Sequence, residues 1–388
     1  MTWLPIFAWA DAPPDHATRR VSNLDGLRGF VALAVVVHHG MIYRHYFLTG
    51  RWELFAPFNT MLGQGGVALF FMLTGYLFWR RLVLARGRID WLRLYIGRVF
   101  RIGPVFLLTA GITILISLFV NRDMHPGVDV LIDQISPYLY IGIREAVPVR
   151  GYDTNLLLAG VMWTLQYEWF FYACLPVLAL FTRLRGMHLP CAVILFAWPL
   201  YALAYGTWPA GITWSPVYVA MFGAGALTAS LQVSGIVFRS DGLVGSVLTL
   251  ALLIAALVGF DRSSYPQAIL VLAGLFYLIT TGCSLFGVLR MRAAHRLGHL
   301  SYGIYLMQGL ALAAVLRPLQ SVSTASPALH IVMLMAATAL LTIMALLGHR
   351  YVEQPGMHVG DRIARWACAG RDRVLALAWP AAEQPSKE

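Results

Sequence analysis

Long apolar runs recur along almost the whole chain, and short polar segments that are rich in arginine separate them. A helix needs about 20 consecutive apolar residues to cross the hydrocarbon core of a bilayer. This criterion predicts an all-α integral membrane protein of about ten transmembrane helices. The predicted spans are 27–46, 61–80, 102–120, 156–181, 189–206, 213–233, 243–260, 266–288, 298–316 and 327–348.

Two segments outside these spans carry different patterns. Residues 129–143 are too polar for a span, and an interfacial or re-entrant helix fits them better. In the tail, residues 349–388, basic and apolar residues alternate in a way that predicts an amphipathic helix on the membrane surface. We therefore expect three regions: a cytosolic lead-in over 1–22, a membrane domain over 23–356 and a cytosolic basic tail over 357–388.

The arginines predict the orientation, because cytoplasmic loops of membrane proteins carry an excess of Lys and Arg. With the N-terminus in the cytosol, most arginines between the predicted spans fall on the inner side, so both termini are predicted to be cytoplasmic. The composition agrees with a membrane protein, since 59% of residues are apolar and only 12% are charged. The net charge of +11 is then a topology signal and an attraction to anionic membrane lipids, and no inner loop is long enough for a nucleic-acid-binding domain.

The first predicted span carries titratable groups at both ends of its apolar run, "LDGLRGFVALAVVVHHG". Arg28 and His39 fall within about 20° of one helical face and about 16 Å apart along the axis, whereas His38 points about 100° away. This stripe would join an anion-binding group at the cytosolic interface to a proton-transfer group near the middle of the membrane. Alternatively, the arginine only snorkels to the interface and the histidine only bonds a neighbouring helix.

Two other spans carry internal polar groups. Glu168 is the one clearly internal carboxylate of the ten predicted spans, and it is expected to find a partner because an unpaired charge is costly there. His39 is the natural candidate, and the alternative is a structural hydrogen bond from a Trp or Tyr. Ser301, Tyr305 and Gln308 form a polar stripe on another span, which is either part of a site or a helix–helix contact.

Arg98 and Arg101 lie one turn apart at the predicted inner end of the third span. Two guanidinium groups in that position can clamp phosphates, or they can serve only as topology determinants. The sequence contains no G-x-S-x-G, H-E-x-x-H or Walker A motif. A phosphate-binding inner mouth with a base deeper in the membrane suits a long donor such as a coenzyme A thioester.

These residues resemble the acyltransferase-3 family of bacterial membrane enzymes, which transfer acetyl or other short acyl groups from acyl-coenzyme A to sugars. The resemblance covers about 22–356, and its most specific element is the Arg-x10-His pattern that Arg28 and His39 fill. Gln308 and Ala68 depart from the family, where many members carry a histidine and an acidic or polar residue. The other matching segments are "GVALFFMLTGYLF", "RVFR", "WTLQYEWFFY", "LSYGIYL" and "RYVEQP".

The resemblance implies a membrane-bound O-acyltransferase in the bacterial inner membrane. It implies acetyl-coenzyme A as donor, a carbohydrate or lipid-linked glycan as acceptor, and no metal. The alternative is a proton-coupled transporter or flippase of a glycolipid, and the oligomeric state stays open. The residues expected to act are His39, Glu168 and Arg28 in catalysis; Arg28, Arg98, Arg101 and Tyr302 in donor binding; and His38, Tyr305 and Gln308 in acceptor binding.

We expect His39 to take the proton of the acceptor hydroxyl, and Tyr302, Tyr305 or Gln308 to donate to the developing oxyanion. Direct transfer is favoured because no activated serine or cysteine is visible. A covalent acyl-histidine is the alternative, and it would produce ping-pong kinetics.

Overall fold

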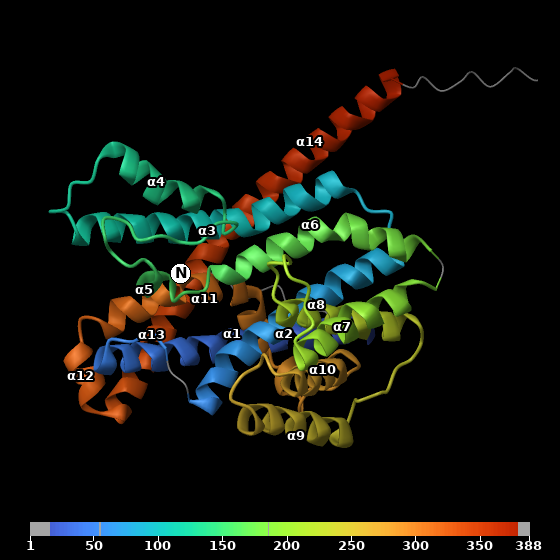
Figure 1. Ribbon diagram of the computed structural model, residues 1–388, viewed down its shortest axis with the longest axis horizontal. Coiled ribbons are helices and arrows are strands. Elements are labelled where there is room, and N and C mark those ends of the chain that lie inside the picture. The colour runs from blue at the N-terminus through green and yellow to red at the C-terminus, as the bar shows by residue number, and fades with distance from the viewer. Residues whose placement is uncertain (1–15, 54–55, 185, 379–388) are drawn as a thin grey trace, which may run out of the picture. The chain divides into compact units, whose positions relative to one another are not determined.

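A computed structural model of the chain describes residues 16–53, 56–184 and 186–378, and this part of the chain is helical without strands (Figure 1). The α-helices are α1 His16–Thr49, α2 Pro57–Leu84, α3 Trp91–Val120, α4 Val128–Leu139, α5 Asn155–Leu158, α6 Trp163–Arg183, α7 His188–Tyr205, α8 Pro216–Val233, α9 Leu243–Gly259, α10 Pro266–Thr280, α11 Arg292–Leu316, α12 Gln320–Ala325, α13 Pro327–Gly348 and α14 Gln354–Ala378. A short 3-10 helix, η1, covers Val288–Arg290, and a π-helical turn, η2, covers His349–Glu353.

The predicted all-α membrane fold is confirmed. Within the described ranges, seven helical segments are long and apolar enough to cross a membrane: α1, α2, α3, α7, α8, α11 and the continuous helix made by α13, η2 and α14. The helices α9 and α10 are apolar but shorter. Each of the ten predicted spans overlaps a helix. Among the described residues, the seven segments above are the ones whose length and apolarity support a crossing of the membrane.

Local chemistry explains where several helices begin. The third predicted span starts at residue 102, but α3 begins earlier, because the Asp90 side chain accepts a hydrogen bond from the Arg93 backbone N–H and caps the helix. The fourth predicted span starts at residue 156, but α6 begins only at Trp163. Ala159 and Gly160 both have positive φ there, which ends the short helix α5 and separates it from α6.

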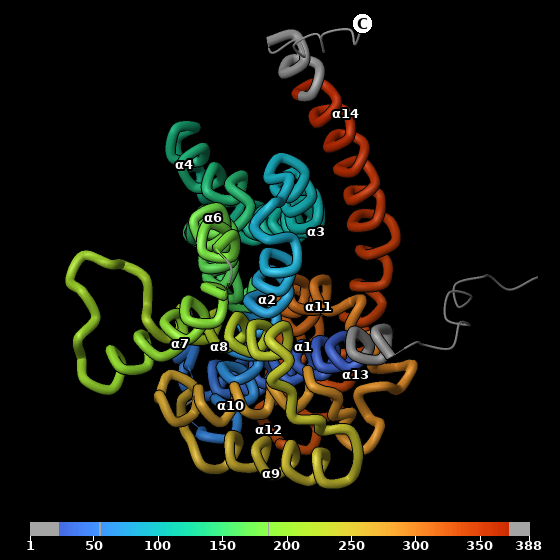
Figure 2. The backbone as a smooth tube through the Cα atoms, turned by 90° about the vertical axis from the view of Figure 1, so that its right-hand side faces the viewer, coloured from blue at the N-terminus to red at the C-terminus, as the bar shows by residue number. Residues whose placement is uncertain are grey.

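The predicted terminal segments are partly described. Most of the lead-in predicted over 1–22 lies outside the described residues, and α1 already begins at His16. The tail forms a helix, as predicted, but this helix continues α13 through η2 and packs along α3 (Figure 2). Gly356 and Gly360 make that packing close: a Cβ at Gly360 would lie 2.4 Å from Phe100 Cβ, and one at Gly356 would lie 2.5 Å from Pro104 Cγ.

The described residues form two compact units. In the first, which covers residues up to 34 together with 56–77 and 192–301, glycines let α2 and α8 pack backbone to backbone. A Cβ at Gly225 would lie only 1.9 Å from the Met72 carbonyl oxygen. Such close approach of small residues is typical of helix packing in membranes.

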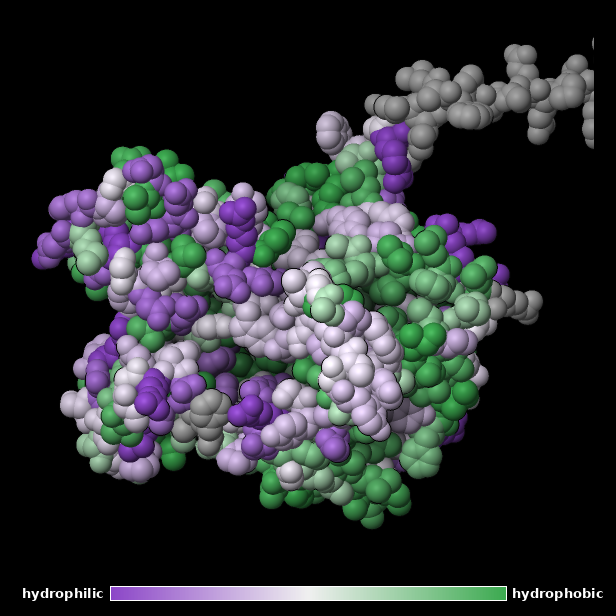
Figure 3. All heavy atoms as spheres, viewed as in Figure 1, coloured by the Kyte–Doolittle hydropathy of each residue, from purple (hydrophilic) through white to green (hydrophobic). Residues whose placement is uncertain are grey.

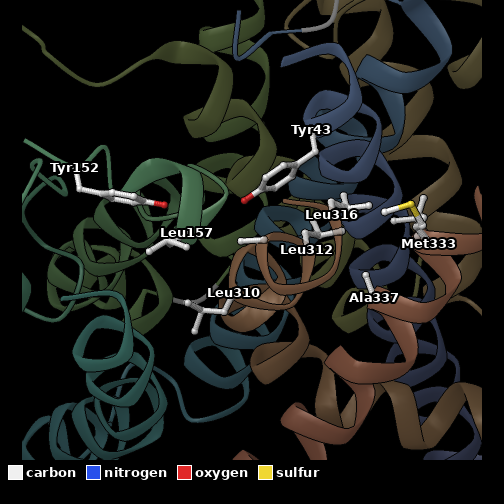
Figure 4. Packing of buried hydrophobic residues seen from close by; sticks show 10 residues of the cluster. Tyr43, Tyr152, Leu157, Leu310, Leu312, Leu316, Met333 and Ala337 are labelled. Atoms are coloured by element: carbon white, nitrogen blue, oxygen red, sulfur yellow. The ribbon is translucent and has the colours of Figure 1, made fainter. Parts of the chain in front are cut away.

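The second unit covers 35–55, 78–191 and the chain from residue 302 onward. Its apolar core joins the end of α1 to α11 and α13, and it includes Tyr43, Tyr152, Leu312 and Met333 (Figure 4). The Tyr43 hydroxyl donates to the Leu156 carbonyl oxygen, so the segment before α6 is fastened to α1. This unit contains all but one of the predicted site residues, the exception being Arg28.

Candidate active site

His39 is held in the second unit by hydrogen bonds to one of its ring nitrogens. Nδ1 lies 3.0 Å from the Val35 carbonyl oxygen, one turn earlier on α1, and 3.1 Å from Gln308 Oε1 on α11. The Gln308 side chain is fully buried, and its Nε2 donates to the Tyr305 carbonyl oxygen at 2.8 Å. This second bond fixes the amide so that its oxygen, and not its nitrogen, faces His39.

The two partners of Nδ1 are both acceptors, so Nδ1 must carry the hydrogen. The neutral imidazole then has an unprotonated Nε2 with a free lone pair, because only one ring nitrogen carries a proton in that state. The arrangement therefore prepares Nε2 of His39 to accept a proton or to attack as a nucleophile.

The structure pairs His39 with Gln308 and not with Glu168, which the sequence suggested as its partner. Glu168 instead accepts a hydrogen bond from the Tyr172 hydroxyl, one turn later on α6. The alternative interpretation, a structural bond from an aromatic residue, describes this contact. The sequence predicts that Gln308 binds the acceptor, not that it orients His39. The polar stripe that ends at Gln308 is the sequence signal that could have indicated this second role.

The predicted arginine clamp lies among aromatic rings and carboxylates. The Arg98 guanidinium lies 5.2 Å from the Phe78 ring centroid and 5.9 Å from that of Tyr172. Arg101 forms an ion pair with Glu353 and lies 5.9 Å from the Tyr302 ring centroid. Each guanidinium therefore already has partners within the protein.

Glu353 is a second internal carboxylate, which sequence reasoning noted only as part of "RYVEQP". Its side chain is completely buried, and besides Arg101 it bonds His349 Nδ1 at 2.9 Å. The π-helical turn η2 holds both residues, and such turns are frequent at functional sites. A carboxylate that directly follows the last apolar run, four residues after a histidine, is the signal that could have identified it.

The tyrosines of α11 connect this helix to α3 and α6. The Tyr302 hydroxyl donates to the Ile102 carbonyl oxygen at 2.7 Å. The Tyr305 hydroxyl lies 3.0 Å from Thr164 Oγ1. The Tyr302 hydroxyl would therefore have to exchange its partner to act on a substrate, and Gln308 Nε2 already gives one of its two hydrogens to the Tyr305 carbonyl oxygen.

The two remaining predicted residues lie on α1. The His38 ring stands edge-on to the His39 ring, with the centroids 5.0 Å apart. Arg28 belongs to the first unit, where its Nη1 lies 4.0 Å from Asp25 Oδ1.

Comparisons with known proteins give the family. The sequence profile of a family described as "Acyltransferase domain" matches residues 21–347. A curated relative, Nodulation protein 10 of Rhizobium leguminosarum bv. viciae, is 25% identical over 174 residues, which cover 42% of this chain and 46% of that protein. The chain thus spans about half the length of this relative, and no solved structure matches it. Since the profile covers most of the chain, the chain belongs to the acyltransferase-3 family, and its long apolar helices are those of a multi-pass membrane protein.

Proposed function

We propose that the protein is an O-acyltransferase that moves an acetyl or other short acyl group from acyl-coenzyme A to a hydroxyl of an envelope or secreted carbohydrate. The observation that carries the proposal is the fixed tautomer of His39, because an unprotonated Nε2 in the membrane interior is the base that the reaction requires. The membership of the family supports acyl transfer, and the donor and acceptor are our proposal.

In the proposed reaction His39 moves one proton and returns to its starting state. Nε2 takes the proton from the acceptor hydroxyl while the oxygen attacks the thioester carbonyl. The imidazolium is stabilised at Nδ1 by the Val35 carbonyl and Gln308 Oε1, which accept its hydrogen. Collapse of the tetrahedral intermediate breaks the carbon–sulfur bond, and the imidazolium gives the proton to the departing thiolate. An acyl-histidine on Nε2 is the alternative course at the same atom.

We propose that Arg98 and Arg101 hold the phosphates of the donor at the end of α3 that begins at Trp91, and that Arg28 also takes part in donor binding. A phosphate can bind two guanidinium groups at once, and it would share Arg101 with Glu353. We further propose ten spans with both termini in the cytoplasm of a bacterium, which places this end of α3 on the cytosolic side of the inner membrane.

The test uses purified protein in detergent with acetyl-coenzyme A and a glycan fraction from bacterial envelopes. We expect the wild type to bind the thioester and release free coenzyme A. His39→Ala should bind without turnover, Arg28→Ala should bind weakly, and His38→Ala is the matched control for loss of a neighbouring ring. If the wild type neither binds nor consumes the thioester, the donor is wrong. Glycolipid flux that collapses with the proton gradient would then favour a transporter.

A further inference from the structure

A hairpin between α3 and α6 returns into the membrane domain. We call residues 121–154 the re-entrant hairpin, and its two arms meet beside the Val120 end of α3. Asn121 Nδ2 donates to the Arg150 carbonyl oxygen at 2.7 Å, and the Arg150 backbone N–H donates to Gln134 on α4 at 3.0 Å. Figure 1 shows α4 running alongside α3 from that end.

The tip of the re-entrant hairpin is a tight turn packed between two helices. The Ile143 N–H donates to the Tyr140 carbonyl oxygen at 3.0 Å, and the two residues between them, Ile141 and Gly142, have φ of 51° and 80°. Positive φ is unusual for a β-branched residue, so the surroundings must hold this turn in place. Trp169 of α6 does so by donating from Nε1 to the Ile141 carbonyl oxygen at 2.8 Å.

The tip lies deep along α3. A Cβ built on Gly103 would lie 3.3 Å from Ile141 Cδ1, so the turn reaches the level of Gly103. At about 1.5 Å per residue, Gly103 is about 25 Å along the helix from Val120, which is most of the thickness of a bilayer core. In the topology proposed above, with Val120 at the outer boundary of the membrane, the hairpin would be re-entrant, which is one of the two alternatives that the polar sequence of 129–143 left open.

Exposed charges follow directly after the tip. Arg144 and Glu145 are both exposed, and the Arg144 guanidinium lies 4.5 Å from the Tyr140 ring centroid. Irregular backbone and exposed charges are not tolerated against hydrocarbon, so in this topology we expect the exposed charges to face water. Figure 3 shows hydrophilic residues gathered over the lobe that carries α4, beside a hollow in this face.

The first turns of α6 also combine aromatic and polar side chains. Trp163, Gln166, Tyr167 and Trp169 are each half-buried. Sugar rings present apolar C–H faces and polar hydroxyl edges, so aromatic rings beside amide and charged groups match both. Phosphates would instead require several cations, and here a single arginine is balanced by a carboxylate.

We propose that the tip of the re-entrant hairpin and the first turns of α6 form the wall of a water-filled vestibule. This vestibule admits the carbohydrate acceptor from the Val120 end of α3, which is the outer side in the topology proposed above. The assignment of a carbohydrate to the vestibule rests on the proposed acyl transfer to carbohydrate. The proposal that a water-filled vestibule exists does not depend on that function.

The first experiment measures water access. In a variant whose four cysteines are replaced by serine, Glu145→Cys is labelled in spheroplasts with a membrane-impermeant maleimide. Leu115→Cys is the control, because Leu115 is 67% exposed on α3 and lies nearer to Val120. We expect Glu145→Cys to react from outside and Leu115→Cys to stay unlabelled. Labelling of Glu145→Cys in neither orientation, or only in inside-out vesicles, would overturn the vestibule and its outer opening.

The second experiment identifies the occupant by kinetics with the glycan fraction of the activity assay. Arg144→Ala and Tyr167→Leu should each raise KM for the glycan about tenfold and leave KM for acetyl-coenzyme A unchanged. A rise in the donor KM instead, or no change in either, would show that the acceptor binds elsewhere. If the wild type shows no transfer at all, the proposed function fails while the labelling result stands by itself.

Discussion

At the scale of single residues, His39 depends on a neighbour that carries no charge. Gln308 accepts the Nδ1 hydrogen and is itself locked by the Tyr305 carbonyl, so the imidazole presents Nε2 in one orientation. A glutamine cannot take the proton onward, which means that the proton accepted at Nε2 must leave from the same atom. This favours a cycle in which the proton passes from acceptor hydroxyl to departing thiolate.

Replacing Gln308 tests this positioning role. Gln308→Leu keeps a similar volume but removes the acceptor, so we expect kcat to fall about 10- to 100-fold, which is the usual cost of losing an orienting partner. The dissociation constant for acetyl-coenzyme A should stay unchanged. Gln308→Glu keeps an acceptor oxygen and should retain more of kcat than Gln308→Leu. Equal losses in both variants would show that Gln308 only fills space.

The buried pair of Arg101 and Glu353 makes a second prediction at this scale. Arg101→Met leaves a completely buried carboxylate without its guanidinium, which costs about 3–5 kcal/mol in comparable cases. We expect a markedly lower thermal midpoint in detergent. The double variant Arg101→Met/Glu353→Leu should recover most of the midpoint but none of the donor binding. Recovery of both would mean that the pair serves only stability.

At the scale of elements, the packing of α14 on α3 depends on two glycines. A side chain at Gly360 would collide with Phe100, so Gly360→Ala should push the helices apart and cost about 1–3 kcal/mol. Gly370 lies on the same helix with nothing within 4 Å of a built Cβ, so Gly370→Ala should be neutral or slightly stabilising. Thermal unfolding of the pair in one detergent measures the contrast. Similar midpoints for both variants would contradict this packing.

The other end of this packing is an ion pair that responds to pH. The Arg371 guanidinium, followed by the Arg93 backbone N–H, lowers the pKa of the Asp90 carboxyl to about 2, from an ordinary 3.8. Because the folded pKa is depressed, its contribution is complete above about pH 5 and is lost as the pH falls from about 4 to 2. The pair is partly exposed, so this contribution is small, about 0.5 kcal/mol.

Asp90→Asn isolates that contribution. We expect the variant to have a slightly lower thermal midpoint than the wild type at pH 7, and the difference should shrink at pH 3. A difference that stays constant across this range would show that the carboxylate charge does not contribute. Other effects of low pH on stability are common to the wild type and the variant, so they cancel in the difference between the two thermal midpoints.

The sequence predicts elements better than the contacts between them. Apolar runs located all ten helices that correspond to predicted spans, because a span must satisfy its backbone internally and so needs only length and apolarity. Partner choice is different, since it depends on how helices far apart in the chain are rotated. The pairs of His39 with Gln308 and of Arg101 with Glu353 each join distant helices. Spacing along one helix carries no information about either.

At the scale of the whole molecule, the number of crossings depends on three helices. The helices α9 and α10 have 17 and 15 residues, which span about 25 and 22 Å, so they are a few ångströms short of a bilayer core. The third, α6, has 21 residues but a polar beginning. Local thinning of the bilayer would allow the short helices α9 and α10 to cross the membrane. A polar vestibule beside α6 would accommodate the polar beginning of that helix.

Reporter fusions test the crossings directly. With the N-terminus inside and α8 ending at Val233, a crossing by α9 puts the loop at 260–265 outside, and a crossing by α10 returns the loop at 281–291 to the inside. We expect alkaline phosphatase fused at Ser263 to be active and fused at Gly287 to be inactive, with a fluorescent protein giving the opposite pattern. If instead both loops report the cytosolic side, α9 and α10 dip into the membrane as a pair without crossing it. Because this removes two crossings at once, the sides of α11 and α13 would stay as proposed, and the opening of the vestibule beside Val120 would still face outward. Fusions at these two loops therefore separate the count of spans from the orientation on which the acceptor route depends.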